Sequence, residues 1–323
     1  MTPDPFAPYL QTLGRGPGKS RALTRDEART AFAAVLAGQV DPHQVGAFLL
    51  LLRYRGEDAD EITGLVEAAR DAARLPAQNL HADLDWPSYG SGQTRGAPWF
   101  LLAALTLARH GFHVLMHGTN EFSTGLAVTD ALAALGMAAA RDRDDAARLL
   151  DTARFAYLPL NVLAPELDRL VGLRTLFGLR SPVNTVVRLL DPANARAGVD
   201  GVFHPAYLAV HLGVAERLGR PRYLVLKGGG GEAERNPAKP ATAHAFFGTP
   251  DAAPITLPAL DASAPGPQDA AHFAAVWNGA PDARAEATVV ATVALGLVAL
   301  GQATAATADA MAAELWVSRA VGR

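Results

Sequence analysis

The sequence predicts an α/β protein with an N-terminal all-helical domain and a larger α/β domain, whose mostly parallel central sheet is flanked by helices. Two observations predict this fold class. Near the N-terminus, apolar residues recur at helical spacing between clear helix starts. The chain that follows alternates short apolar runs with long segments of helical period, which is typical of parallel strands joined by crossover helices. Half of the 323 residues are hydrophobic, so a large core can form.

Helix starts in the first part of the chain follow known capping patterns. Thr24 with Glu27, and Asp58 with Glu61, have capping-box spacing, in which each side chain bonds the backbone N–H of the other residue. The pair Asp41-Pro42 joins an N-cap residue to a proline at the first helical position. The periodicity lapses at residues 75–79 around a proline. We therefore expect the helical domain at residues 1–74.

Short apolar runs predict the strands of the second domain. They lie at Phe112–Met116, Phe155–Leu158, Tyr223–Leu226 and near Ile255. The segment from residue 191 to residue 201 reads as turn-rich, and a helix is expected after it. The apolar run from residue 289 to residue 300 is shorter than the roughly 20 residues that span a bilayer, so a buried helix is expected there.

Composition limits the function classes. The net charge of −3 disfavours a uniformly basic nucleic-acid coat, although a local basic face remains compatible with it. The chain has no cysteine, which excludes disulfides, a thiolate nucleophile and cysteine-ligated metal. The N-terminus lacks the pattern of a signal peptide. We expect a cytoplasmic protein without a membrane partner.

A glycine loop at residues 89–96 is the first candidate site. Backbone N–H groups of Gly90, Ser91, Gly92 and Thr94 can converge on a phosphate, and Pro98 can open a helix directly afterwards. The loop carries Arg95 and no carboxylate, whereas proteins that bind pyrophosphate use acids to hold Mg²⁺. A plain strand-to-helix turn explains the glycines equally well.

Three stretches of the chain resemble anthranilate phosphoribosyltransferase and the related pyrimidine nucleoside phosphorylases. They are residues 23–57, residues 116–120 ahead of 132–136, and Leu173–Phe177. The resemblance implies a helical domain joined by hinges to an α/β domain at residues 80–170 and 191–323, with helices near 173–190 that return to the helical domain. It also implies a homodimer formed through the helical domain.

The departures from that family fall on substrate-binding positions. The family has a Gly-Thr-Gly-Gly-Asp loop at the position of Gly90–Thr94, where this chain lacks the aspartate. The family's Asn-x-Ser-Thr stretch corresponds to Ala97–Phe100 here. Its Lys-His-Gly-Asn becomes Met116–Thr119, which keeps His117 and Gly118. The family's anthranilate-binding arginine falls near Asp168 and Arg169, with the register open by one residue.

The pattern at residues 98–102, Arg180–Asn184 and Lys227–Pro237 looks most like the YbiB-type branch of the family. Members of that branch keep the fold but are associated with nucleic-acid binding. The first hypothesis is therefore a degenerate phosphoribosyltransferase fold, inactive as an enzyme, which binds single-stranded DNA or RNA through a basic groove between its domains. The groove residues would be Arg174, Arg180, Arg188, Lys227, Arg235 and Lys239, whose side chains can each contact a phosphate.

The second hypothesis is an active glycosyl or phosphoribosyl transferase that uses phosphoribosyl pyrophosphate and Mg²⁺ with a different acceptor. Gly90–Arg95 would hold the phosphates, together with His117, Gly118 and Thr119 at the carboxyl end of a strand. Glu232 and Glu234 flank one residue on a glycine-rich turn and could converge on a metal ion, although a solvated loop is the simpler interpretation. No other cofactor is expected.

Overall fold

Four helices open the chain in the computed structural model, which describes residues 4–16, 18–90, 96–249, 253–261 and 263–319. They are α1 (Ala7–Gly14), α2 (Arg25–Leu36), α3 (Pro42–Arg55) and α4 (Ala59–Ala72). Both predicted capping boxes form, at the starts of α2 and α4. The Asp41 side chain accepts from the backbone N–H of His43 and caps α3 as predicted. Local sequence thus determines where these helices begin.

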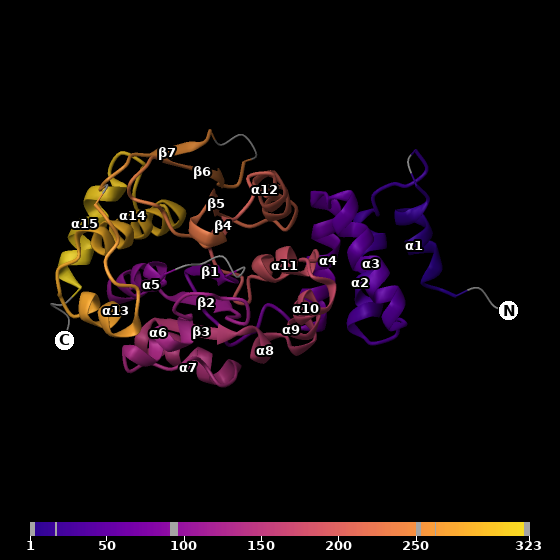
Figure 1. The fold of residues 1–323 in the computed structure, drawn as a ribbon, viewed down its shortest axis with the longest axis horizontal. Helices are drawn as coiled ribbons and strands as arrows, with labels where there is room; N and C mark the ends of the chain where they lie inside the picture. Colours follow the sequence, from indigo (N-terminus) through magenta and orange to yellow (C-terminus); the bar gives the residue numbers. More distant parts are fainter. Residues whose placement is uncertain (1–3, 17, 91–95, 250–252, 262, 320–323) are drawn as a thin grey trace.

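The four helices form one end of the molecule (Figure 1). Helices α2 and α4 pack closely, and Gly64 permits this approach. Any larger residue there would clash, since a Cβ atom on Gly64 would lie 2.2 Å from the carbonyl oxygen of Arg25. Helix α4 also contacts α11 (Val183–Val186) and α12 (Tyr207–Arg217) of the second part of the chain. Buried residues of these four helices belong to the same core as buried residues on one face of the sheet, among them Leu115 and Val225.

A seven-stranded sheet forms the second part, in the order β3-β2-β1-β4-β5-β6-β7. The first five strands in sequence are parallel to one another, whereas β6 and β7 are added in antiparallel pairs. The strands are β1 (Leu84–Ser88), β2 (Val114–Gly118), β3 (Phe155–Pro159), β4 (Ala197–Val202), β5 (Tyr223–Lys227), β6 (Ala241–Phe246) and β7 (Ile255–Leu257). The fold class predicted from the sequence is confirmed.

The other helices of the described residues lie between and after the strands in sequence. They are α5 (Trp99–Arg109), α6 (Val128–Ala134), α7 (Arg143–Ala153), α8 (Leu160–Leu163), α9 (Pro165–Gly172), α10 (Arg174–Phe177), α11 (Val183–Val186), η1 (Val187–Leu189), α12 (Tyr207–Arg217), η2 (Gly229–Gly231), α13 (Ala270–Trp277), α14 (Ala283–Leu300) and α15 (Ala308–Ser318). Helices α5 and α14 pack on each other, and α12 packs on β5 and β6. Figure 1 shows α8–α11 between the sheet and the N-terminal helices.

Alternation along the strands divides the interior into two cores. Leu115 on β2 belongs to the core that includes the N-terminal helices, whereas its neighbour Met116 belongs to the core beneath α5 and α14. The apolar run at residues 289–300 lies inside α14 and is almost entirely buried, as expected. Among the described residues, no helix combines the length and the apolar character needed to cross a membrane.

The prediction of a turn-rich segment at residues 191–201 was wrong in its second half, because β4 begins at Ala197. Gly201 in this strand permits close packing. A Cβ atom on Gly201 would lie 2.2 Å from the carbonyl carbon of Glu232. Strands β1 and β6 were also not predicted, because Pro87 in β1 and the alanine-rich β6 lack the apolar pattern of a strand.

Candidate functional site at the switch point of the sheet

Chain connections reverse direction between β1 and β4, which lie side by side in the sheet. From β1 the sheet continues through β2 to β3, and from β4 it continues through β5. Open α/β sheets bind ligands outside the carboxyl ends of the strands at such a switch point. Here the strand ends are Ser88, Gly118, Val202 and Lys227. Three pockets lie around these ends.

The first pocket, here named the cradle pocket, lies where the glycine loop meets α5. Its described lining residues are Ser88, Gly90, Gly96, Pro98, Phe100, Asn120, Ser123, Leu126, Val128 and Glu232. Of the predicted phosphate-binding residues in the loop, Gly90 is in this lining, while Ser91, Gly92, Thr94 and Arg95 lie outside the described residues. Helix α5 starts at Trp99, directly after Pro98 as the sequence predicts.

Glu232 and Glu234 bring two carboxylates to this pocket and to the adjoining start of α5. Neither carboxylate oxygen of Glu232 has a hydrogen-bond partner among the described residues, and the side chain is buried. Glu234 accepts a hydrogen bond from the backbone N–H of Phe100 at 2.9 Å. Burial raises the pKa of Glu232 to about 7 and that of Glu234 to about 8. Two carboxyl groups that are this hard to ionise mark a place where a cation would be favourable.

His117 lies at the end of β2 but is fully buried. The Tyr89 hydroxyl lies 2.8 Å from its Nδ1, and the Asp85 carboxylate lies 3.1 Å from its Nε2. Asp85 also forms a salt bridge with Arg220 at 2.9 Å. Both imidazole nitrogens are therefore engaged inside the protein, which differs from the predicted phosphate contact. Sequence position alone could not show that the His117 ring points into the protein core.

The second pocket, here named the polar pocket, lies beyond the ends of β2 and β3. Its described lining residues are Gly118, Thr119, Asn120, Glu121, Thr129, Tyr157, Pro159, Leu160, Asn161 and Asp168. Two predicted residues, Gly118 and Thr119, are thus in this lining. Burial raises the pKa of Asp168. Neighbouring Arg169 instead pairs with Glu166 on the surface at 3.1 Å, so Asp168 is the residue that faces the pocket.

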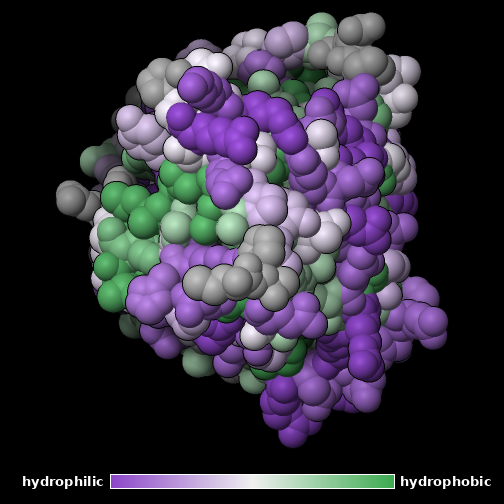
Figure 2. Space-filling model, turned by 90° about the vertical axis from the view of Figure 1, so that its right-hand side faces the viewer, coloured by the Kyte–Doolittle hydropathy of each residue, from purple (hydrophilic) through white to green (hydrophobic). Residues whose placement is uncertain are grey.

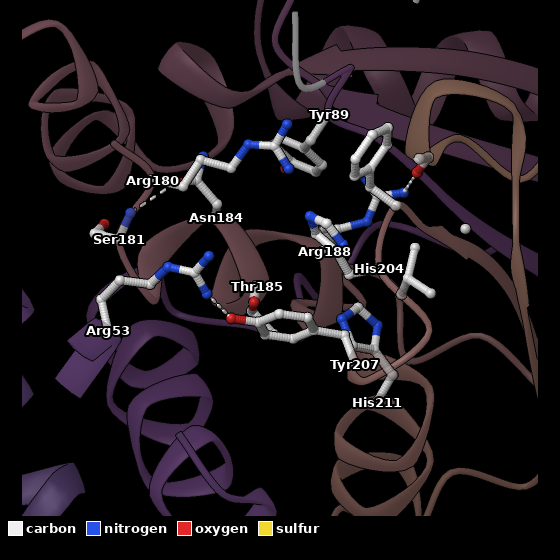
Figure 3. A pocket seen from close by; sticks show the side chains of 14 residues that line it. Arg53, Tyr89, Arg180, Ser181, Asn184, Thr185, Arg188, His204, Tyr207 and His211 are labelled. Atoms are coloured by element: carbon white, nitrogen blue, oxygen red, sulfur yellow. Dashed lines mark hydrogen bonds between the residues drawn. The ribbon is translucent and has the colours of Figure 1, made fainter. Parts of the chain in front are cut away.

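The third pocket, here named the interdomain pocket, lies between α3 and the switch point (Figure 3). Its described lining residues are Arg53, Tyr89, Arg180, Ser181, Asn184, Thr185, Arg188, Gly201, Val202, Phe203, His204, Tyr207, His211 and Gly231. Arg188 is buried and bonds Asp200 and the carbonyl oxygen of Gly231. The guanidinium of Arg53 bonds the hydroxyl of Tyr207.

The basic residues predicted to form one groove are dispersed. Arg180 and Arg188 line the interdomain pocket, whereas the Arg174 guanidinium lies 4.6 Å from the ring centroid of Phe122. Lys227 and Lys239 are exposed. Arg235 is buried, with its guanidinium 2.6 Å from the carboxylate of Asp309 on α15. Arg235 therefore has a packing role in this structure, because its charge is neutralised inside the protein.

Two family descriptions match this chain. "Glycosyl transferase family, helical bundle domain" matches residues 7–73, and "Glycosyl transferase family, a/b domain" matches residues 100–318. The chain belongs to this glycosyl transferase family. The anthranilate phosphoribosyltransferases of Methylorubrum populi and Methylorubrum extorquens are each 31% identical to it, over 93% of this chain and 90% of their own lengths.

Solved structures agree with this family membership. Anthranilate phosphoribosyltransferase from Thermus thermophilus superposes with a TM-score of 0.82 at 25% identity, covering 96% of this chain and 95% of its own. The Saccharomyces cerevisiae enzyme, solved in complex with PRPP and Mg, has a TM-score of 0.75 at 16% identity. It covers 97% of this chain and 94% of its own, and at that identity the likeness concerns the fold alone.

These relatives overturn the hypothesis of a degenerate fold that binds nucleic acid. The anthranilate phosphoribosyltransferases named above match across nearly the whole chain, and the YbiB-type branch is not shown. The structure explains why the basic pattern misled. Arg188 and Arg235 are neutralised by Asp200 and Asp309, so the predicted basic residues do not form one exposed row. Arg188 and Arg235 look available in the sequence but are paired with carboxylates in the fold.

Proposed function

We propose that this protein is an active phosphoribosyltransferase whose acceptor differs from anthranilate. Its membership in the glycosyl transferase family and its 31% identity to anthranilate phosphoribosyltransferases support transfer of a phosphoribosyl group. The observation that carries the proposal is the position of Asn120, which lines both the cradle pocket and the polar pocket. A donor in the first pocket and an acceptor in the second would meet at that residue.

The cradle pocket fits a pyrophosphate donor with its cation. The Glu232 carboxylate, buried and without a hydrogen-bond partner among the described residues, has the hard oxygen donors that Mg²⁺ prefers. Glu232 would hold the ion with help from Glu234, and the ion would neutralise charge on the departing pyrophosphate. Ser88 and the backbone at Gly90 and Gly96 would orient the phosphates, while Leu126 and Val128 would exclude water from the reacting carbon.

The polar pocket argues against anthranilate as the acceptor. Among its described lining residues are two carboxylates, Glu121 and Asp168, and no lysine or arginine. Burial is the cause of the raised pKa of Asp168. A carboxylate on the acceptor would meet like charge in a partly buried site, which disfavours binding. An amine that is neutral or cationic matches the lining better.

Turnover of phosphoribosyl pyrophosphate tests this function directly. Pyrophosphate release would be measured with Mg²⁺ and a panel of amines, with anthranilate as the carboxylate-bearing reference. Release that depends on an amine, and is lost in Glu232→Gln, would support the proposal. Glu216→Gln on the exposed side of α12 is a matched control that should keep full activity. The proposal would be overturned if calorimetry detected no binding of phosphoribosyl pyrophosphate and no amine of the panel led to pyrophosphate release.

We also propose that the protein forms a homodimer through its N-terminal helical end. Large hydrophobic side chains are exposed on α3, on α10 and just beyond α10, including Tyr54 (91% exposed), Leu176 (79%) and Leu179 (50%). Figure 2 shows an apolar area on this end of the molecule beside a largely hydrophilic surface. Such side chains favour burial against a partner. Light scattering on the wild type and on Leu176→Glu would test this, and a monomeric wild type would contradict it.

A further inference from the structure

Tyr157 on β3 has a buried hydroxyl group that the packing of the fold does not require. The residue is 1% exposed, and its hydroxyl has no hydrogen-bond partner among the described residues. A buried hydroxyl without a partner costs free energy, and phenylalanine would fill the same space without that cost. The equally buried Tyr223, by contrast, donates its hydroxyl to Asp200 at 2.8 Å. Packing therefore explains the ring of Tyr157 but not its hydroxyl.

The Tyr157 side chain reaches from β3 over the end of the neighbouring strand β2. Gly118 is the last residue of β2, and a Cβ atom there would lie 3.2 Å from the Tyr157 hydroxyl oxygen. The same Cβ atom would lie 1.7 Å from the carbonyl oxygen of Ser88, the last residue of β1. The absence of a side chain at Gly118 thus leaves room for the phenol at the carboxyl ends of these strands.

This position brings the hydroxyl to the border between the polar pocket and the cradle pocket. Tyr157 lines the polar pocket together with Gly118 and Asn120, and Asn120 also lines the cradle pocket. Burial, together with the charge of Glu232 in the cradle pocket, raises the pKa of Tyr157. The phenol therefore remains protonated at neutral pH, and its oxygen can still accept a hydrogen bond.

The amide of Asn120, which is adjacent, is engaged elsewhere. Its Nδ2 donates to the hydroxyl of Thr129 at 3.3 Å, and its Oδ1 accepts from the backbone N–H of Val128 at 3.1 Å. It opposes the rise in the pKa of Tyr157 only in part and makes no well-formed hydrogen bond with the phenol. Because the polar pocket also contains the carboxylates of Glu121 and Asp168, its lining favours a ligand with N–H donors.

We propose that Tyr157 determines acceptor specificity, because its hydroxyl oxygen accepts a hydrogen bond from the N–H of a neutral aromatic amine in the polar pocket. This inference rests on the proposed function, which assigns the acceptor to that pocket. A hydrogen bond through N–H leaves the nitrogen lone pair available to face the donor in the cradle pocket. Asp168 selects the acceptor by charge, whereas Tyr157 selects an amine hydrogen at the point of transfer.

Calorimetry on the full chain tests this contact, with Mg²⁺ and pyrophosphate present to occupy the cradle pocket without a reaction. The probes are 2-aminobenzylamine and benzylamine, which lacks the aromatic amine. Tyr157→Phe should weaken binding of 2-aminobenzylamine about tenfold and leave that of benzylamine unchanged, because only the first probe loses a hydrogen bond. Unchanged affinity for 2-aminobenzylamine, equal weakening of both probes, or no binding of 2-aminobenzylamine to the wild type would overturn the proposal.

Stability measurements separate recognition of the acceptor from a structural role. Tyr157→Phe should keep or raise the urea midpoint of unfolding, because the lost hydroxyl has no hydrogen-bond partner among the described residues. Tyr223→Phe is the matched control, which removes the bond to Asp200 and should lower the midpoint without changing the affinity for either probe. A lowered midpoint in Tyr157→Phe would assign its hydroxyl to the fold and overturn the proposal.

Turnover distinguishes this inference from the proposed function. In Tyr157→Phe, KM for 2-aminobenzylamine should rise about tenfold while KM for phosphoribosyl pyrophosphate stays unchanged, because the donor lies in the other pocket. Pyrophosphate release with equal KM values for the amine in both proteins would overturn the role of Tyr157 alone. Absence of donor binding and of pyrophosphate release with every amine would instead overturn the proposed function.

Discussion

Glu234 accepts a hydrogen bond from the backbone N–H of Phe100, 2.9 Å away, although 134 residues separate them in sequence. Phe100 lies in the first turn of α5, where N–H groups have no partner within the helix. Pro98 and Trp99 offer no side-chain cap for this helix, so the distant carboxylate performs that role. The glycine-rich turn after β5 is thereby tied to the helix that follows the glycine loop.

This contact predicts different effects for two substitutions of Glu234. Glu234→Ala should lower the free energy of unfolding by about 1–3 kcal/mol, because the buried N–H of Phe100 loses its acceptor. Glu234→Gln should lower it less, since the amide oxygen can still accept. Urea unfolding of both variants measures the difference. Equal losses in the two variants would show that the hydrogen bond is not the stabilising element.

Asp200 is the centre of a buried network with Arg188, His211 and Tyr223. Asp200→Asn should lower the free energy of unfolding by about 3–5 kcal/mol, because Arg188 is left as an uncompensated buried charge. The matched control is Asp60→Asn, which removes an exposed ion pair with Arg217 and should change it by less than about 1 kcal/mol. Chemical denaturation compares them, and similar small effects in both would contradict the expectation.

The same network predicts a loss of stability in acid. Burial opposes ionisation of Asp200, but Arg188 and His211 outweigh it and hold the pKa of that carboxyl below its usual range. A carboxyl whose pKa is lower in the folded than in the unfolded state stabilises the fold at pH values above its unfolded pKa, which is about 3.9 for aspartate. This contribution is lost as the pH falls toward the pKa of the folded state. The free energy of unfolding should therefore decline below about pH 4. A pH series of urea titrations on wild type and Asp200→Asn checks this, and the variant should show the smaller decline.

Replacing Gly201 by a larger residue should create a packing defect at the turn that carries Glu232. A Cβ atom there would lie 2.2 Å from the carbonyl carbon of Glu232, so Gly201→Ala must displace the turn after β5. We expect destabilisation of about 1–3 kcal/mol together with reduced pyrophosphate release. Gly172→Ala is the control, because its nearest atom beyond the chain neighbours would be 3.9 Å away. Thermal unfolding and activity are measured together, and unchanged values in Gly201→Ala would refute the close contact.

Asp168 predicts the acceptor preference of the proposed reaction. The comparison uses anthranilate and 2-aminobenzylamine, which differ by a carboxylate and an aminomethyl group. Asp168→Asn should lower the ratio of kcat/KM for 2-aminobenzylamine to kcat/KM for anthranilate by about tenfold. The substitution removes a negative charge from the polar pocket, which repels the carboxylate of anthranilate and attracts the ammonium group of the amine. Arg169→Gln on the exposed side of α9 should leave that ratio unchanged. The same preference in wild type and Asp168→Asn would exclude this role.

Much of the fold could be predicted from local sequence. Thr24, Asp41 and Asp58 mark helix starts through bonds to residues two or three positions away, so their signals need no tertiary contact. Strand β4 was missed. Its Gly201 is needed because the backbone of Glu232, which is distant in sequence, approaches closely there. The domain boundaries and the homodimer remain predictions.

The candidate site was predicted less well, because it depends on direction and pairing. The sequence brought forward Gly90, Thr119, Arg180 and Glu232, which line the pockets around the switch point. It did not reveal that His117 points into the core, or that Asp168 rather than Arg169 faces the polar pocket. Arg53 and Tyr207 were also missed, since their only signal is a contact across 154 residues.

The sequence by itself determined the helical N-terminal part, the α/β class and the set of groups available for chemistry, since periodicity and capping act over a few residues. Tertiary structure alone decided which charges remain available. Arg235 and Arg188 are buried and have carboxylate partners, whereas Glu232 is buried without a hydrogen-bond partner among the described residues. The physical reason is that the energy of a charge depends on its burial and its partner, and both are set by residues far away in the chain.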